Sequence, residues 1–177
     1  ERIRKAAYQS MEAPIQKRLH AYAGIHLLEF GSREPGYFER HLFKLVGHLN
    51  SGREYLEELH RSRLAALNLQ AGTQTLAGGD PESALSLFRA GLLDSHLCDT
   101  QTEFDLKLQT ARAEALSGSP AASESLFRDL YARTSDSELR LSVYRTHIPL
   151  LTLYNRYEQA LERGRKALEE FGPIEAA

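Results

Sequence analysis

The chain has 177 residues, which is enough for one domain that folds on a single core without a disulfide or a structural metal. Its 22 Lys and Arg residues nearly balance 24 Asp and Glu residues, with both signs mixed along the chain. This balance argues against nucleic acid or an anionic membrane as a partner, because either favours a surface of one sign. A single cysteine, Cys98, excludes an internal disulfide and any multi-cysteine metal site. No apolar run is long enough to span a bilayer, and we expect a reducing, cytoplasmic location.

Glycine and proline gather in a few short segments, and the stretches between them have the lengths of helices. Apolar residues recur at spacings of three and four, as in Ile15, Leu19 and Tyr22, which is the pattern of an amphipathic helix. No stretch alternates for long enough to indicate a strand. The sequence therefore predicts an all-α protein, with N-terminal helices near 2–11, 13–30 and 36–50. Because the chain opens at Glu1 within a helical pattern, we expect it to be a segment of a longer protein.

Three helical hairpins are predicted after these helices: 54–77 with 81–97, 102–117 with 120–133, and 137–154 with 157–171. Their second helices align when Ala84 is placed over Ser123 and Ser123 over Ala160. A small residue recurs there because the two helices of a hairpin cross closely. We divide the chain into residues 1–53, which lead into the repeats, and residues 54–177, which contain them. The hairpins cover about 54–97, 102–133 and 137–171. The expected architecture is a right-handed stack of antiparallel hairpins, a superhelix of about seven helices.

Turn residues support these boundaries. Gly78 is expected to take the left-handed conformation, Asp80 to cap the following helix, and Pro81 to occupy its first position. Gly118, Ser119 and Pro120 are expected to take the same three roles, and Asn155 replaces glycine in the third turn. Pro149 lacks the amide that would bond to Arg145, so we expect the helix over 137–154 to bend or divide there.

The turn and second helix of the first hairpin (76–88) and of the third (155–168) resemble tetratricopeptide repeats. A tetratricopeptide unit has 34 residues, and the longer units here imply longer helices or longer connections. The Trp and the paired Gly-Tyr of the repeat are replaced by Asn68, Gly72 and Thr75 in the first unit. The resemblance implies a tetratricopeptide-like fold.

Four blocks in order, at 3–11, 19–24, 41–50 and 64–72, resemble the helical region that follows the AAA-type ATPase module in large bacterial and fungal signalling proteins. Those proteins often begin with a Ser/Thr kinase-like domain and end in sensor, histidine kinase or cyclase domains. Gly47 and Pro149 depart from the family's pattern. The resemblance implies an architecture and a signalling context without a catalytic residue. The chain has no glycine-rich loop ending in Lys-Ser/Thr, so we expect no ATP binding and no cofactor.

Candidate chemical groups are few. No two of the seven histidines have the helical spacing of a metal site, so we expect hydrogen-bonded histidines and no metal. Asp94 and Asp99 near Cys98 should raise the pKa of the thiol and keep it unreactive. The acidic pairs, Glu57-Glu58 and Glu169-Glu170, are expected to face solvent, where they cannot share a substrate. Arg61 and Arg63 could anchor a phosphate or an acidic peptide, although we favour ion pairs with Glu57 and Glu58.

In stacked hairpins the usable surface is the concave wall formed by successive first helices. In the tetratricopeptide register this wall includes two apolar contacts, Leu69 and Leu76, and five polar positions: Thr73, Gln109, Ser142, Arg145 and Thr152. Some of these side chains could instead pack against the next repeat.

The sequence favours a non-enzymatic interaction and regulatory module of a multidomain signalling ATPase or kinase. It would couple the ATPase to output domains by contacting them, another signalling protein or a small-molecule effector. The alternative is an independent tetratricopeptide-like adaptor that holds an extended peptide in its groove. The two differ at the ends: an excised domain should expose apolar residues such as Ile3, Ala7, Tyr8 or Ile174, whereas an adaptor should end in a polar capping helix. The polar residues of 162–170 slightly favour a cap. We expect no enzyme activity in this segment.

Overall fold

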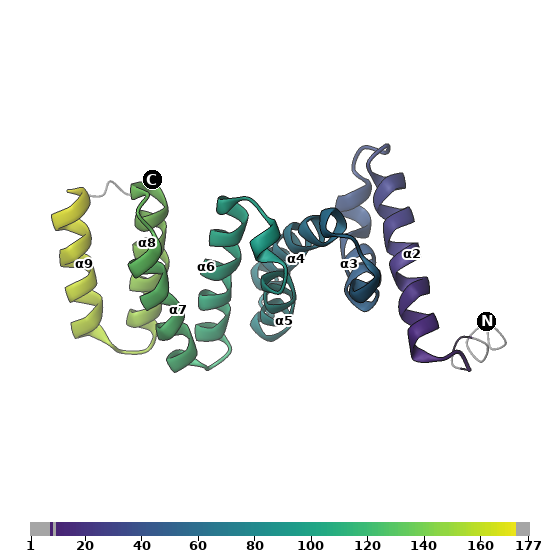
Figure 1. Ribbon diagram of the computed structural model, residues 1–177. Helices are drawn as coiled ribbons and strands as arrows, with labels where there is room; N and C mark the ends of the chain where they lie inside the picture. The colour runs from purple at the N-terminus through teal and green to yellow at the C-terminus, as the bar shows by residue number, and fades with distance from the viewer. Residues whose placement is uncertain (1–7, 9, 173–177) are drawn as a thin grey trace.

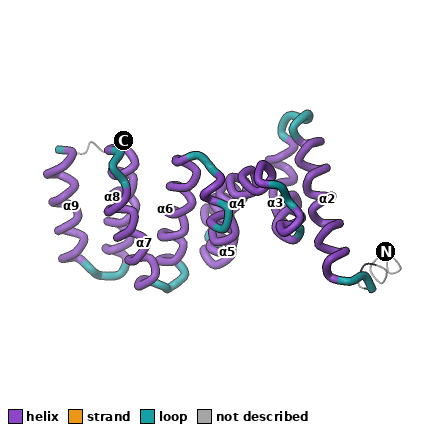
Figure 2. Tube along the Cα trace, in the orientation of Figure 1, coloured by secondary structure: helices purple, strands orange, loops and turns teal. Residues whose placement is uncertain are grey.

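The computed structural model describes residue 8 and residues 10–172. Over this part of the chain it is entirely helical, with eight α-helices and no strand (Figures 1 and 2), so the all-α prediction is confirmed. The helices are α2 (Ala13–Gly31), α3 (Tyr37–Ser51), α4 (Glu58–Ala77), α5 (Pro81–Leu92), α6 (Thr100–Leu116), α7 (Pro120–Arg133), α8 (Ser137–Leu153) and α9 (Tyr157–Phe171). Most of the helix expected over 2–11 lies outside the described residues. None of the described helices is both long and apolar enough to cross a membrane.

The predicted boundaries agree with the structure to within a few residues except around the first hairpin. Helix α4 begins at Glu58 rather than at residue 54, because a 3₁₀ turn, η1 (Arg53–Tyr55), precedes it. Helix α5 ends at Leu92 rather than at residue 97, and a second 3₁₀ turn, η2 (Ser95–Leu97), follows it. Helix α8 runs without interruption through Pro149, so the proline does not divide it.

The helices follow one another in chain order along the molecule, with α2 at one end and α9 at the other (Figure 1). Consecutive helices pack in pairs, and α6 also contacts both α4 and α8. Three apolar clusters fill the array. The first joins α2, α3 and α4, the second joins α4, α5 and α6, and the third joins α6, α7 and α8. Each hairpin therefore buries its apolar side chains partly against the next one, as in a helical repeat.

The turns inside the three hairpins have the same geometry. Each contains one residue with a positive φ: Gly79 at 86°, Gly118 at 82° and Asn155 at 58°. The same backbone hydrogen bond closes each turn, from Asp80 N to Thr75 O, from Ser119 N to Glu114 O and from Arg156 N to Leu151 O. These bonds satisfy carbonyls that the helix end leaves free. The repeat read from the sequence is thus present in the backbone.

Two details of the expected turns are wrong. Gly78 has a φ of −75°, and the left-handed residue is Gly79. The side chain of Ser119 makes no capping bond, whereas Asp80 accepts one from the Ser83 amide at 3.0 Å. Pro81 and Pro120 begin their helices as expected.

A buried ion-pair cluster holds the two 3₁₀ turns beside α4. Asp94, which is almost fully buried, lies 2.5 Å from Arg53 of η1 and 2.5 Å from Arg61 of α4. The predicted pairing of Arg61 with Glu57 or Glu58 is therefore wrong. The fold places Asp94, 33 residues away in the sequence, beside the Arg61 guanidinium. Arg63 also pairs with neither glutamate: it donates to Ser32 and lies over the ring of Phe38.

Candidate functional site

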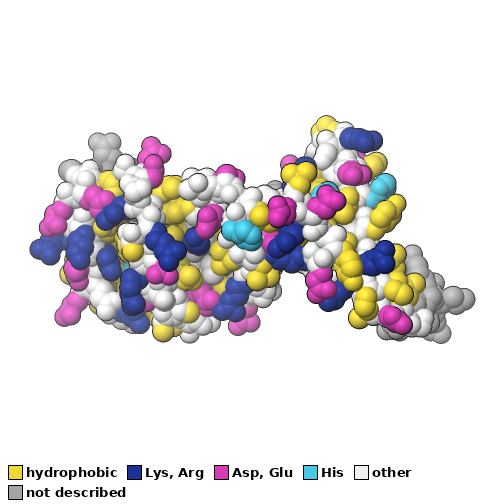
Figure 3. Space-filling view, viewed as in Figure 1, with side chains coloured by type: hydrophobic (Ala, Val, Ile, Leu, Met, Phe, Trp, Pro, Cys, Tyr) yellow, Lys and Arg dark blue, Asp and Glu magenta, His cyan; other side chains and the backbone are white. Residues whose placement is uncertain are grey.

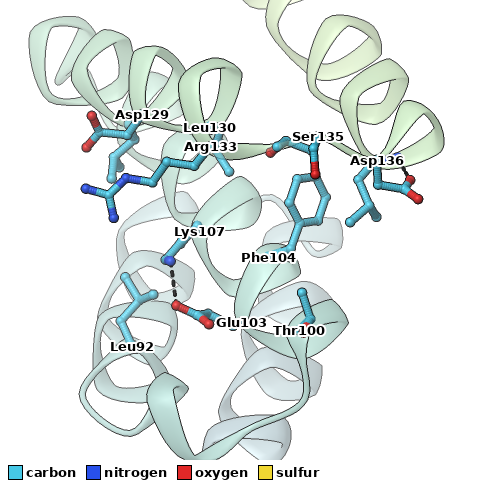
Figure 4. Close-up of a pocket in the computed structure, with 13 residues that line it drawn as sticks. Leu92, Thr100, Glu103, Phe104, Lys107, Asp129, Leu130, Arg133, Ser135 and Asp136 are labelled. Atoms are coloured by element: carbon cyan, nitrogen blue, oxygen red, sulfur yellow. Dashed lines mark hydrogen bonds and ion pairs between the residues drawn. The ribbon is translucent and has the colours of Figure 1, made fainter.

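An apolar groove of about 400 Å³ lies at the open end of the α6/α7 hairpin. It lies between the last residue of α5, the first two turns of α6, the last turns of α7 and the start of α8 (Figure 4). Pockets of this size and character are where proteins hold small ligands or the side chains of partners. We name it the α6–α8 groove.

Two helix caps and one short connection position the residues that line the groove. Asp99 caps α6 by accepting from the Thr102 amide at 2.8 Å, which starts the helix so that Glu103, Phe104 and Lys107 share one face. Asp136 caps α8 in the same way through the Leu139 amide. Only three residues separate α7 from α8, so the α8 start is held against the end of α7.

The interior of the groove is apolar. Phe104 and Leu130 are buried members of the cluster that joins α6, α7 and α8, and Leu126 and Leu139 pack against it. Leu92 closes the side toward α5. An apolar group that entered the groove would displace water from these side chains, which is the favourable step in burying it.

Charged side chains surround the opening. Lys107 and Glu103 neutralise each other through an ion pair of 2.5 Å, one helical turn apart. Arg133 and Asp129 are exposed and make no ion pair in the described part of the chain. Figure 4 shows Arg133 extending from α7 toward the side of the groove where Leu92 and Lys107 lie. The groove can therefore accept an apolar group and offer a free guanidinium to an anionic group beside it.

The seven residues expected on the concave wall do not line this groove. Leu69 and Leu76 are half-buried and pack against the cluster that joins α4, α5 and α6. The hydroxyls of Thr73, Ser142 and Thr152 each donate to a carbonyl of their own helix. Gln109 is half-buried with its carbonyl oxygen unpartnered, and Arg145 is exposed. The binding role of these seven side chains stays a prediction.

Sequence reasoning missed the groove, although one signal was available. Leu126 and Leu130 form an apolar row on α7 next to the row of Phe127 and Tyr131, so this helix has a wider apolar face than one neighbour can cover. A wide face indicates that two helices pack on it. The sequence does not show that they diverge and leave a groove.

Histidines that are distant in sequence meet in the structure. The Nδ1 atoms of His20 and His48 lie 2.9 Å apart, and Tyr8 bonds to the other nitrogen of His20. Burial and the neighbouring His20 lower the pKa of His48. His147 is buried, stacks on Phe127 and bonds to Glu124 at 3.1 Å, and burial lowers its pKa. Among the described residues, no three His, Cys, Asp or Glu side chains converge as metal ligands.

The structure agrees with the expected direction for Cys98. The pKa of its half-buried thiol is raised, first by burial and then by Asp99 and Asp94, which counteracts the hydrogen bond with Ser62. A raised pKa keeps the sulfur protonated at neutral pH, so it is a poor nucleophile.

Comparison of the chain with protein-family models, with curated proteins and with solved structures gave no match.

Proposed function

We propose that this protein is a non-catalytic interaction module that holds an apolar group of a protein partner in the α6–α8 groove. The observation that carries the proposal is the composition of the groove, five apolar side chains inside and a free Arg133 at its opening. The visible face of the molecule mixes Lys and Arg with Asp and Glu (Figure 3), which suits a protein partner better than a polyanion.

We further propose that the array is a tetratricopeptide-like, right-handed superhelix with its first helices forming a concave wall. Three equivalent turns and the contacts of α6 with both α4 and α8 support this arrangement. On the resemblance of four sequence blocks, the module belongs to a cytoplasmic signalling ATPase or kinase. Its role there is to couple the ATPase to output domains or to an effector.

The second candidate is an independent adaptor for an extended peptide. An open groove beside a row of first helices suits such a ligand, but an adaptor is expected to end in a polar capping helix. Helix α9 instead leaves Leu161 and Leu168 exposed. Tyr8 is also exposed at the other end, whereas Ile3, Ala7 and Ile174 lie outside the described residues. These exposures favour the first candidate.

The experiment is site-specific photocrosslinking in cells of the source organism, with a benzophenone amino acid at Ser135 on the groove and, as a control, at Gln159 on α9. We expect a crosslinked partner from Ser135 only, and its loss with Arg133→Glu but not with the exposed control Arg128→Glu. Neighbouring domains of the same chain in the product support coupling, and an unrelated protein supports the adaptor. No product above the Gln159 control would overturn the groove as the binding site. A parallel Arg145→Glu variant tests the concave wall, because a partner held there should be lost with it.

A further inference from the structure

Two histidines from the neighbouring helices α2 and α3 meet in the folded chain. His20 lies in the first half of α2, and His48 lies in the last turn of α3. Their Nδ1 atoms are 2.9 Å apart, and their ring centroids are 5.0 Å apart. The two residues are 28 positions apart in the sequence, so residue spacing within one helix does not indicate the contact. We name His20 and His48 the histidine pair.

Tyr8 holds the ring of His20 in its orientation. The Tyr8 hydroxyl lies 2.7 Å from His20 Nε2, and the two rings meet edge to face. When Nε2 carries the proton and donates it to the Tyr8 oxygen, His20 Nδ1 has a free lone pair. Histidines that bind a metal usually donate their other ring N–H to an oxygen, which fixes the tautomer and the ring orientation. Tyr8 therefore prepares His20 Nδ1 as a ligand atom.

The surroundings of His48 also favour a ligand atom. Burial is the main cause that lowers the pKa of this imidazole, and His20 and Lys44 lower it further. His48 is therefore neutral at neutral pH, as a histidine must be to bind a metal. Its place in the last turn of α3 lies near the partial negative charge at the end of the helix, which attracts a cation. Lys44, which is exposed one turn earlier, opposes this attraction.

A divalent ion can replace the proton that links the two Nδ1 atoms. Two nitrogens bound to one tetrahedral ion at about 2.0–2.1 Å lie about 3.3 Å from each other. The histidine pair therefore needs to open by about 0.4 Å, which a small rotation of the two side chains provides. Both side chains are half-buried, so an ion can reach the nitrogens and water can fill its remaining positions.

We propose that the histidine pair binds Zn²⁺ or a chemically similar divalent transition-metal ion through the Nδ1 atoms of His20 and His48. Imidazole nitrogen suits ions of this class, whereas Mg²⁺ and Ca²⁺ need oxygen ligands. The bound ion links α2 to α3. With two protein ligands the site is weaker than a structural zinc site, which has four. It is separate from the α6–α8 groove, and either proposal can fail without the other.

Isothermal titration calorimetry with zinc chloride tests the proposal, in a Cys98→Ala background that removes the thiol. We expect one Zn²⁺ per chain. His20→Gln and His48→Gln should each weaken the affinity at least tenfold, because each removes one of the two protein ligands. His26→Gln is the matched control, since His26 is exposed on the same helix as His20 and should leave the affinity unchanged. A chain that binds no Zn²⁺ up to about 1 mM, or glutamine variants that keep the parent affinity, overturn the proposal.

NMR of the histidine rings gives a test that changes neither ligand. The ring signals of His20 and His48 should move together as Zn²⁺ is added, and those of His26 should stay in place. Signals of the histidine pair that do not respond while Zn²⁺ binds elsewhere on the chain contradict the proposal. Tyr8→Phe removes the hydroxyl that orients His20 and should weaken the affinity about tenfold. An unchanged affinity in Tyr8→Phe would overturn the orienting role of Tyr8.

Discussion

Gly72 in the first hairpin and Gly164 in the last are both helical glycines, but their surroundings are opposite. A methyl group on Gly72 of α4 would lie 2.4 Å from a ring carbon of the buried Phe88 on α5. Gly164 stands on α9 where α5 has Phe88, and a methyl group there would meet no described atom within 4 Å. The turns that connect the two pairs of helices nevertheless have the same hydrogen bonds. Turns of the same geometry therefore do not ensure the same packing, since the α4 glycine faces a buried ring and the α9 glycine faces no described side chain.

The largest difference in unfolding free energy is expected between alanine variants of two equivalent leucines, one on α5 and one on α9. Leu85 is 8% exposed and Leu161 75%. Leu85→Ala should lower the free energy of unfolding by about 2–4 kcal/mol, because it removes buried methyl groups and leaves a cavity. Leu161→Ala should change it by less than about 0.5 kcal/mol. Urea denaturation at low protein concentration measures both, and equal losses would show that α9 is covered in solution.

Alanine at the two glycines should act with opposite signs. Gly72→Ala should destabilise by about 1–3 kcal/mol, because the new methyl group displaces the Phe88 ring within a filled core. Gly164→Ala should stabilise by about 1 kcal/mol, because alanine has the higher helix propensity and nothing obstructs it. Thermal unfolding of the two variants beside the parent gives the signs. A stabilising Gly72→Ala would mean that the ring moves freely.

A smaller effect should appear with pH. The last hairpin has His147 where the first has Ala71, and burial lowers the pKa of this histidine from 6.5, against the opposing effect of Glu124. The unfolded chain then binds a proton more readily than the folded one as the pH falls. The free energy of unfolding should therefore be highest above about pH 6.5 and decrease below it.

The histidine contribution is measured by urea denaturation between pH 7.5 and about 5, above the range in which carboxylates titrate. His147→Gln should flatten the decrease, and His96→Gln, at an exposed site, should leave it unchanged. His48, whose pKa burial also lowers, contributes to the decrease in the same direction. A slope that His147→Gln does not alter would show that His147 takes up its proton equally well in both states.

Much of the fold could be read from local sequence. The helices of the second and third hairpins begin and end within two residues of the predicted positions, because proline, Asp caps and positive-φ residues act within one or two turns. The left-handed residue was placed at Gly78 instead of Gly79, because either of two adjacent glycines can take a positive φ after a helix. The 3₁₀ turn η2 could not be foreseen in this way, because Asp94, the residue just before it, is held by ion pairs with η1 and α4.

The candidate site was much less predictable. None of the concave-wall residues lines the groove, and Arg61 found its partner 33 residues away. His20 and His48 have no helical spacing, yet they touch because α2 and α3 are antiparallel neighbours. Such pairs depend on where two helices cross, and the residue spacing within one helix does not indicate the crossing point.

By itself the sequence determined the helical class, the repeat of three hairpins and the positions of their turns, since helix periodicity, capping and left-handed residues are local properties. Only the tertiary structure decided that α6, α7 and α8 border an apolar groove with Arg133 at its edge, and that Leu161 and Leu168 of α9 are exposed in the described part of the chain. The angle at which two helices pack, and the faces they leave exposed, depend on the side-chain volumes of several helices together. Those side chains meet only in the folded chain.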